Sequence, residues 1–148
     1  MLIEHILYSK GHDVATIGPD ASVAEAVALL RKRNIGAVVV VDAESRISGI
    51  LSERDIVRAL AEETVEHTAI LERRVSDLMT SEVATCGSRS SVNDLMRIMT
   101  DRRIRHVPVV DDGRLNGIVS IGDVVKSRIG ELETEAGTLH EYLSSGRT

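Results

Sequence analysis

The segment Gly49-Ile50-Leu51-Ser52-Glu53-Arg54-Asp55 returns 68 residues later as Gly117-Ile118-Val119-Ser120-Ile121-Gly122-Asp123. An earlier segment, Val14-Ala15-Thr16-Ile17-Gly18, returns as Val83-Ala84-Thr85-Cys86-Gly87 with an offset of 69. The offset changes by one residue within a predicted turn, as a true structural repeat requires. The chain therefore contains one supersecondary unit twice. Two such copies sharing a core predict that a site in one copy has a counterpart in the other.

The composition limits the kinds of partner. At 148 residues the chain makes one compact domain or two fused half-domains. Aromatic residues are only 1% of the chain, which argues against recognition of nucleic acid by base stacking. The net charge of −5 provides no electrostatic footprint for DNA, although arginines cluster at 102–105.

The compartment is predicted from what the chain carries. Cys86 is the one cysteine, so no internal disulfide forms, and a reducing compartment is expected. The first residues lack the basic and apolar regions of a signal peptide. No apolar run approaches the ~20 residues of a membrane-spanning helix. We therefore expect a cytoplasmic protein.

Each copy predicts the order strand–helix–strand–strand–helix. Ser22 with Glu25 fits a capping box at the start of a helix, and Ser91 with Asp94 repeats it. The apolar run at 37–41 predicts a strand buried on both faces. The predicted fold is mixed α/β (α+β), with first strands around 14–16 and 83–85. The copy of the apolar run, at 107–110, contains a proline, which predicts a strand start or edge.

The chain divides into five predicted segments. These are a lead-in at 1–13, repeat 1 at 14–61, a linker at 62–82, repeat 2 at 83–129 and a C-terminal helical tail at 130–148. Residues 75–80 predict one helical turn inside the linker. Gly130 and Gly137 are expected to weaken a single long helix at the end of the chain. Apolar residues recur along it, which predicts packing on a partner: Val125, Ile129, Leu132, Leu139 and Leu143.

The sharpest repeated polar feature is Ser-x-x-Asp, at Ser52/Asp55 and Ser120/Asp123. Both pairs follow a hydrophobic strand and open a helix, where free N–H groups suit an anion. A serine hydroxyl can donate to a phosphate or ribose oxygen, and the aspartate can accept from two vicinal hydroxyls. The alternative is that serine and aspartate simply cap the helix. Matched positions in both copies favour a binding role.

Two further features are candidates for ligand contact. Thr16 and Thr85 lie beside short apolar strands and could read a base edge, or be ordinary strand-end threonines. Repeat 2 places Arg105-His106 before its strand where repeat 1 has Gly36-Ala37. Arginine can bind phosphate bidentately, and histidine adds a donor that is stronger when charged. A partly buried, satisfied histidine is the alternative for His106.

Catalytic patterns are not found in the sequence. There is no Gly-x-Ser-x-Gly elbow, no Walker sequence and no Gly-x-Gly-x-x-Gly. The five histidines and one cysteine lack metal-ligand spacing. We therefore expect neither enzyme activity nor a required metal.

Across about residues 10–128 these motifs resemble a tandem pair of cystathionine β-synthase (CBS) domains, also called a Bateman module. The resemblance rests on the Val-x-Thr openings and on the Ser-x-x-Asp endings that follow Gly-aliphatic-aliphatic. It implies two pseudo-two-fold-related β-α-β-β-α units packed through their sheets, with two clefts between them. It also implies a standalone module that binds an adenosyl ligand, AMP first, with ADP, ATP, NAD or S-adenosylmethionine as alternatives. A homodimer is implied as well.

The resemblance carries site residues onto this sequence. It assigns ribose binding to Asp55 and Asp123, their hydroxyl partners to Ser52 and Ser120, and adenine-side contacts to Thr16 and Thr85. The full set of expected nucleotide-binding residues is Asp123, Ser120, Thr85, Arg105, His106, Val107, Pro108, Asp55, Ser52, Thr16 and Arg54. We expect Asp123, with Arg105 and His106 on the phosphate, to form the better site.

Two functions from different classes remain open at this point. The first is a regulatory sensor that binds an adenine nucleotide and changes conformation or dimer geometry. The second is a structural or partner-docking module whose clefts bind nothing. Intact aspartates in both repeats favour the sensor. A third possibility, nucleic-acid binding through the arginines at 102–105, is disfavoured by the acidic charge balance.

Overall fold

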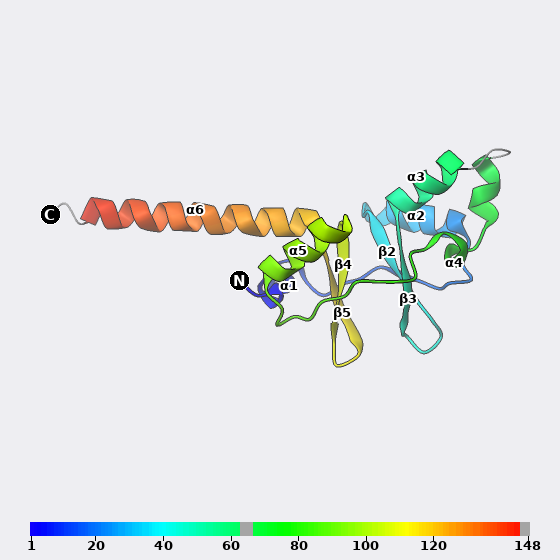
Figure 1. Cartoon of the computed structure of the whole chain (residues 1–148), viewed down its shortest axis with the longest axis horizontal. Helices are drawn as coiled ribbons and strands as arrows, with labels where there is room; N and C mark the ends of the chain where they lie inside the picture. Colours follow the sequence, from blue (N-terminus) through cyan, green and yellow to red (C-terminus); the bar gives the residue numbers. More distant parts are fainter. Residues whose placement is uncertain (63–66, 146–148) are drawn as a thin grey trace.

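The computed structural model describes residues 1–62 and 67–145, and it shows two similar units side by side (Figure 1). Repeat 1 contains β1 (Thr16–Ile17), α2 (Val23–Arg33), β2 (Ala37–Val41), β3 (Ile47–Ser52) and α3 (Glu53–Glu62). Repeat 2 contains α5 (Val92–Arg102), β4 (His106–Asp111), β5 (Arg114–Ser120) and α6 (Ile121–Ser145). Outside these units lie α1 (Ile3–Lys10), the 3₁₀ helix η1 (His67–Glu72) and α4 (Val75–Leu78). The mixed α/β fold with two small sheets is confirmed.

The first sheet has the order β1-β2-β3, with β1 parallel and β3 antiparallel to β2. Residues 37–40 of the central strand β2 are buried, as the continuous apolar run predicted. The short first strand was predicted around 14–16 and is observed at Thr16–Ile17. Central position and burial on both faces explain why this strand is almost entirely valine.

The second sheet contains only β4 and β5, which are antiparallel. The strand predicted around 83–85 is reduced to a single parallel bridge between Cys86 and Val109. Pro108, which was expected at a strand start or edge, is the third residue of β4, opposite Ile118 of β5. Its missing N–H is tolerated because, among the described residues, the other side of β4 is bordered only by this isolated bridge.

Both capping serines act as predicted. The Ser22 hydroxyl accepts a hydrogen bond from the backbone N–H of Glu25 at 3.1 Å, and Ser91 accepts from Asp94 at 3.0 Å. Each helix also ends the same way, in a left-handed residue: Asn34 after α2 and Arg103 after α5. The repeat is therefore preserved in backbone conformation as well as in sequence.

The lead-in at 1–13, predicted only as a short segment ending in a turn, contains the helix α1. Ile3 and Leu7 of α1 are buried in the core of repeat 2, whereas Val75 of α4 is buried in the core of repeat 1. The backbone contacts match: the N–H of Ile3 donates to Ser90 at 2.9 Å, and the N–H of Val75 donates to Ala21 at 2.8 Å. Each repeat is thus completed by the helix that precedes the other one.

The C-terminal helix α6 is continuous from Ile121 to Ser145 and contains Gly130 and Gly137, which were expected to weaken it. Val124 is buried against the body of repeat 2, whereas residues 132–145 are exposed on every side. Figure 1 shows the outer part of this helix projecting away from both units. None of the described helices is long and apolar enough to cross a membrane. The predicted linker at 62–82 lies partly outside the described residues.

Candidate nucleotide-binding clefts

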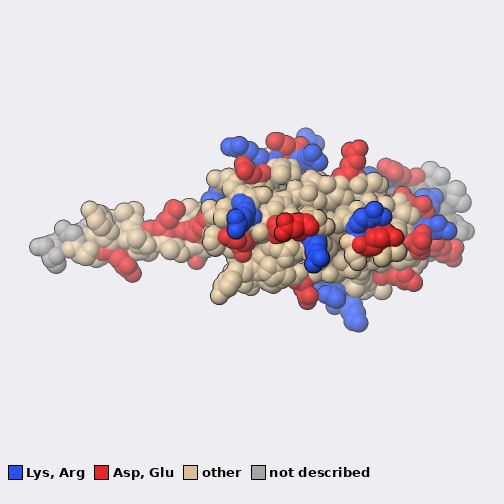
Figure 2. Space-filling model, turned by 90° about the horizontal axis from the view of Figure 1, so that it is seen from below, with Lys and Arg blue, Asp and Glu red and all other residues tan. Residues whose placement is uncertain are grey.

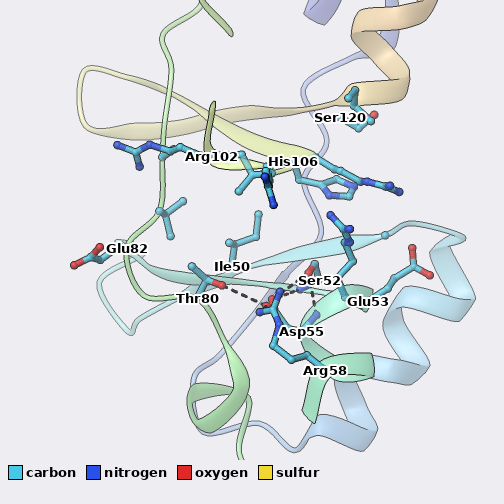
Figure 3. A pocket seen from close by; sticks show the side chains of 18 of the residues that line it. Ile50, Ser52, Glu53, Asp55, Arg58, Thr80, Glu82, Arg102, His106 and Ser120 are labelled. Atoms are coloured by element: carbon cyan, nitrogen blue, oxygen red, sulfur yellow. Dashed lines mark hydrogen bonds and ion pairs between the residues drawn. The ribbon is translucent and has the colours of Figure 1, made fainter. Parts of the chain in front are cut away.

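A cavity of about 520 Å³ lies between the two repeats; we call it the Asp55 cleft. One wall is the end of β3 and the start of α3 in repeat 1, together with Thr80. The other wall is the segment 102–106 and the start of α6 in repeat 2. In Figure 3, Ser52, Asp55 and Thr80 face Arg102, His106 and Ser120 across this space. The volume lies in the range of small-molecule sites, which is about 300–1,000 Å³.

Asp55 is held by a reciprocal cap. Its Oδ2 accepts from the backbone N–H of Ser52 at 2.9 Å and from the Ser52 hydroxyl at 3.1 Å, while the Asp55 N–H donates to Ser52 Oγ at 3.3 Å. On its other oxygen, Oδ1, the Thr80 hydroxyl donates at 3.4 Å and the Arg58 guanidinium lies at 3.5 Å. The Asp55 side chain is only 9% exposed. The capping interpretation is therefore correct, and it fixes the carboxylate at the edge of a cavity.

Cations line the rest of this cleft. The arginines around it are Arg54, Arg58, Arg102, Arg103 and Arg105. Glu53 and Glu82 are the acidic residues that accompany Asp55. Several arginines along one cavity suit a phosphate or another multivalent anion, because each guanidinium offers paired N–H donors.

His106 stands between the two clefts. Burial lowers the pKa of its imidazole below the ordinary 6.5; Lys10 and Arg105 act in the same direction, while Glu53 and Asp123 oppose it. His106 is therefore neutral near pH 7. In that form one ring nitrogen donates and the other accepts a hydrogen bond.

The second cavity, of about 460 Å³, contains Asp123, and we call it the Asp123 cleft. The cap is the same as in repeat 1: Asp123 Oδ2 accepts from the N–H of Ser120 at 2.8 Å, and the Asp123 N–H donates to Ser120 Oγ at 3.2 Å. What meets the carboxylate is different. The ammonium group of Lys10 lies 2.7 Å from Asp123 Oδ2 and donates to the carbonyl of Ile118 at 2.8 Å.

The Lys10 ion pair determines the titration of Asp123. Burial raises the pKa of this carboxyl, but hydrogen bonds from Lys10 and Ser120 and the charge of Lys10 outweigh it. The net result is a pKa below the ordinary value of 3.8. Asp123 is therefore a carboxylate that already has a cationic partner.

The two clefts also differ where a phosphate would lie. The repeat offset of 69 places Asn34, Gly36 and Ala37 at the positions of Arg103, Arg105 and His106. Asn34, Gly36 and Ala37 line the Asp123 cleft. Arg103, Arg105 and His106 line the Asp55 cleft. Within the segment 33–37, Arg33 is the residue that brings a positive charge to the Asp123 cleft. His106 lines this cleft from repeat 2. The Asp123 cleft is therefore the poorer of the two in cations.

The structure groups the expected site residues differently from the sequence analysis. Ser52, Arg54, Asp55, Arg105 and His106 line one cleft together. The sequence predicted that Arg105 lies with Asp123, and this is wrong: Arg105 lines the cleft of Asp55. The reason is that the two repeats face each other, so the helix start of one lies opposite the strand start of the other.

Four expected residues line neither cleft. Thr16 is exposed and lines a separate hollow with residues 17–21 and 41–43. Thr85 is exposed, whereas Val107 and Pro108 are buried within β4. The residues that the sequence analysis missed are Thr80 and Lys10, whose positions depend on long-range packing. Thr80 reaches Asp55 because its backbone pairs with Ile50, at 2.9 and 3.0 Å.

No group of three or more histidine, cysteine, aspartate or glutamate side chains suited to a metal ion is found within residues 1–62 and 67–145. Cys86 is a free cysteine whose pKa is raised to about 11 by burial and, secondarily, by the charge of Asp111. A thiol with so high a pKa is a poor nucleophile near neutral pH.

Comparison with family models identifies the fold family. The CBS domain model matches the chain twice, at residues 8–62 and 75–130. The chain belongs to the CBS domain family. The tandem arrangement inferred from the internal repeat is thereby confirmed. Among curated relatives, the match covers 62% of the CBS domain-containing protein CBSX3 from Arabidopsis thaliana, which is 37% identical, and 66% of a 17.7 kDa protein from Acidianus ambivalens, which is 33% identical. The chain therefore spans less than two thirds of the length of each.

Solved structures of CBS proteins are similar over nearly the whole chain. The CBS-domain protein ATU1752 from Agrobacterium tumefaciens is 49% identical, with a TM-score of 0.81 over 86% of this chain and 92% of that one. The CBS domain pair of MJ0100, in complex with 5′-methylthioadenosine and S-adenosyl-L-methionine, is 30% identical, with a TM-score of 0.77 over 88% and 98%. PAE2072 from Pyrobaculum aerophilum, complexed with AMP, is 26% identical, with a TM-score of 0.72 over 83% and 89%.

Proposed function

We propose that this CBS pair is a regulatory module that binds an adenosine nucleotide, AMP in the first place, in the Asp55 cleft. The observation that carries the proposal is a capped carboxylate, Asp55, at one end of a cavity whose other wall holds arginines. The carboxylate accepts from the two ribose hydroxyls. Arg103 and Arg105, with His106, hold the phosphate. Adenosyl ligands in the structures of MJ0100 and PAE2072 support this choice of ligand class.

The walls of the cleft come from both repeats, which explains how binding would change the conformation of the protein. Asp55 and Thr80 contact each other on one side, whereas Arg105 and His106 belong to repeat 2. A nucleotide that binds both walls favours the conformation in which the two repeats hold it together. The ligand shifts the population of conformations by the difference between its affinities for them. This is a sensing role and requires no catalytic group.

The choice of ligand is tested by titration of protein shown by mass spectrometry to be free of nucleotide. AMP, ADP, ATP, NAD and S-adenosylmethionine are titrated separately by calorimetry and in thermal melts. A ligand at about 100 times its dissociation constant adds roughly 2.7 kcal/mol to the stability. A chain of this size should then melt about 5–10 °C higher. If none of the five shifts the melt, the chain is the structural or docking module and the sensing role is wrong.

We also propose that two copies pair through α6. Val125, Ile129, Leu132, Leu139 and Leu143 are each at least half exposed. Together with Ala136 they recur at alternating spacings of four and three, which is the seam of a two-stranded coiled coil. Helices this exposed are marginal in water without packing of their apolar face.

The charges on α6 favour a second copy in the antiparallel direction. Lys126 and Arg128 lie near its start, whereas Glu131, Glu133, Glu135 and Glu141 follow them. Acidic side chains are visible on the projecting part of the helix in Figure 2. An antiparallel pair sets the basic start of each helix beside the acidic half of the other, and a parallel pair sets acid beside acid.

Light scattering tests this pairing. The unaltered chain should give at least twice the 16.1 kDa chain mass. The double variant Leu132→Glu/Leu139→Glu places charges in the seam and should give the monomer. The control Thr138→Glu adds a charge on the opposite face of the same helix and should stay dimeric. A monomer for the unaltered chain at all concentrations would exclude the dimer.

A further inference from the structure

Lys10 and Thr80 contact equivalent acceptors in the two clefts, but one is a charged residue and the other is neutral. In repeat 1 the N–H of Thr80 donates to the carbonyl of Ile50 at 2.9 Å, and the Thr80 hydroxyl donates to Asp55 at 3.4 Å. In repeat 2 the equivalent acceptors are the carbonyl of Ile118 and the carboxylate of Asp123. The ammonium of Lys10 donates to both of them, at 2.8 and 2.7 Å. One charged group thus replaces a backbone N–H and a neutral hydroxyl.

The replacement follows from the local sequence. Leu7 of α1 and Met79 after α4 contact matching glycines in the two repeats, Gly117 and Gly49. The shared Val-Ala segment begins seven positions after Leu7 but only four positions after Met79, so the first copy is three residues longer here. Lys10 lies in that extra length, as the last residue of α1. The three extra residues therefore bring a lysine to the carboxylate of the other repeat.

From these contacts we propose that Lys10 closes the Asp123 cleft to ribose, so that nucleotide binding is restricted to the Asp55 cleft. The proposal rests on the function proposed above and assigns Lys10 as the residue that determines which cleft binds. A ribose diol at Asp123 must displace an ammonium group that is held at two points and is 30% exposed. At Asp55 the neighbouring cation is Arg58, which is farther away, at 3.5 Å, and 67% exposed.

The chemistry of the closed cleft also determines which ligand it takes once Lys10 is removed. Asn34, Gly36 and Ala37 stand where the Asp55 cleft has Arg103, Arg105 and His106. With few cations to hold a phosphate, the opened cleft should bind adenosine about as well as AMP. The Asp55 cleft should instead prefer AMP, because its arginines contact the phosphate.

The decisive experiment isolates the Asp123 cleft. Asp55→Ala removes the ribose contact in the other cleft, and adenosine and AMP are titrated by calorimetry into this variant and into Asp55→Ala/Lys10→Met. Methionine keeps most of the length of the lysine stem and removes the charge. Adenosine should bind at least about tenfold more tightly to the double variant, since a charge-assisted contact no longer competes for Asp123. Adding Asp123→Ala should abolish the gain.

The matched control is Asp55→Ala/Lys32→Met, which removes one exposed positive charge from α2 at a residue that lines neither cleft. It should bind adenosine no better than Asp55→Ala alone. An equal gain in this control, no gain with Lys10→Met, or weaker binding with Lys10→Met would each overturn the proposal. Weaker binding would mean that Lys10 is itself a ligand contact.

A second measurement uses the chain with Asp55 intact. The stoichiometry of adenosine should rise from about one to about two per chain on Lys10→Met, with one set of sites still preferring AMP. If the unaltered chain binds AMP and Lys10→Met adds no site, the closure is wrong and the proposed function stands. If the unaltered chain binds no nucleotide but Lys10→Met gains adenosine, the proposed function is wrong and the closure stands. If neither binds, both are wrong.

Discussion

The Asp55 and Asp123 clefts have the same backbone and different chemistry. Both contain a strand end, a serine–aspartate cap and a helix start, with cap distances that agree within 0.1 Å: 2.9 and 2.8 Å, then 3.3 and 3.2 Å. Yet one carboxylate meets a threonine hydroxyl and a cavity lined with arginines, and the other meets a lysine. The two copies share this scaffold. They differ in the extra residues that bring Lys10 to Asp123 and in the arginines that line the Asp55 cleft.

The largest expected effect separates the two aspartates. Asp55→Ala should weaken AMP binding about 100-fold or more, because two charge-assisted hydrogen bonds to the ribose are lost. Asp123→Ala should change AMP affinity less than about threefold, because Lys10 already occupies that carboxylate. Calorimetric titration of both variants measures the ratio. Equal losses would show that the clefts are equivalent, and a larger loss for Asp123 would restore the order expected from sequence.

The next comparison concerns the stability of the fold. A Cβ at Gly49 would lie 2.7 Å from the backbone oxygen of Thr80 and 2.6 Å from the sulfur of Met79. The three atoms nearest to a Cβ at Gly117 all belong to the side chain of Leu7, the closest at 2.6 Å, and a side chain yields more easily than backbone. Gly49→Ala should therefore lower the free energy of unfolding by about 1–3 kcal/mol, and Gly117→Ala by less. Urea denaturation of the two variants checks the order, which a larger loss at Gly117 would reverse.

The third comparison separates phosphate from ribose. Arg105→Ala should weaken AMP binding by about tenfold while leaving adenosine binding nearly unchanged, since one charge-assisted contact to phosphate is lost. Arg31→Ala, an exposed arginine on α2, serves as the control and should affect neither ligand. Competition between AMP and adenosine gives both affinities in one assay. Equal weakening of both ligands would place Arg105 on the nucleoside instead of on the phosphate.

The smallest expected effect is a pH dependence near neutral pH that comes from His106 of repeat 2. Burial lowers the pKa of His106 below 6.5 despite Glu53 and Asp123, with Lys10 and Arg105 acting in the same direction as burial. The unfolded chain therefore binds more protons at this position as the pH falls through 6.5. The stability of the folded protein should therefore be full above pH 6.5. It should decline as the pH falls toward the lower pKa that His106 has in the folded state. His106→Gln should flatten this decline in melts between about pH 7.5 and pH 5. An unchanged slope would show that His106 does not titrate in this range.

The internal repeat was sufficient to predict most of the fold. The apolar run at 37–41 is the buried central strand β2, and Ser22 and Ser91 cap their helices. These features depend on residues within a few positions of each other, where periodicity and capping are strong signals. The weaker predictions concerned the ends. A helix was not predicted in the lead-in, and α6 continues through Gly130 and Gly137.

Sequence by itself determined that two similar carboxylates exist, Asp55 and Asp123, each with a serine three residues before it. Only the tertiary structure decided that Arg105 lies with Asp55, because the start of a strand in one repeat faces the start of a helix in the other. It also decided that Lys10 reaches Asp123 across 113 positions of sequence. Local sequence fixes hydrogen bonds within a turn of helix. Contacts between distant segments depend on how two cores pack, and no local pattern records that.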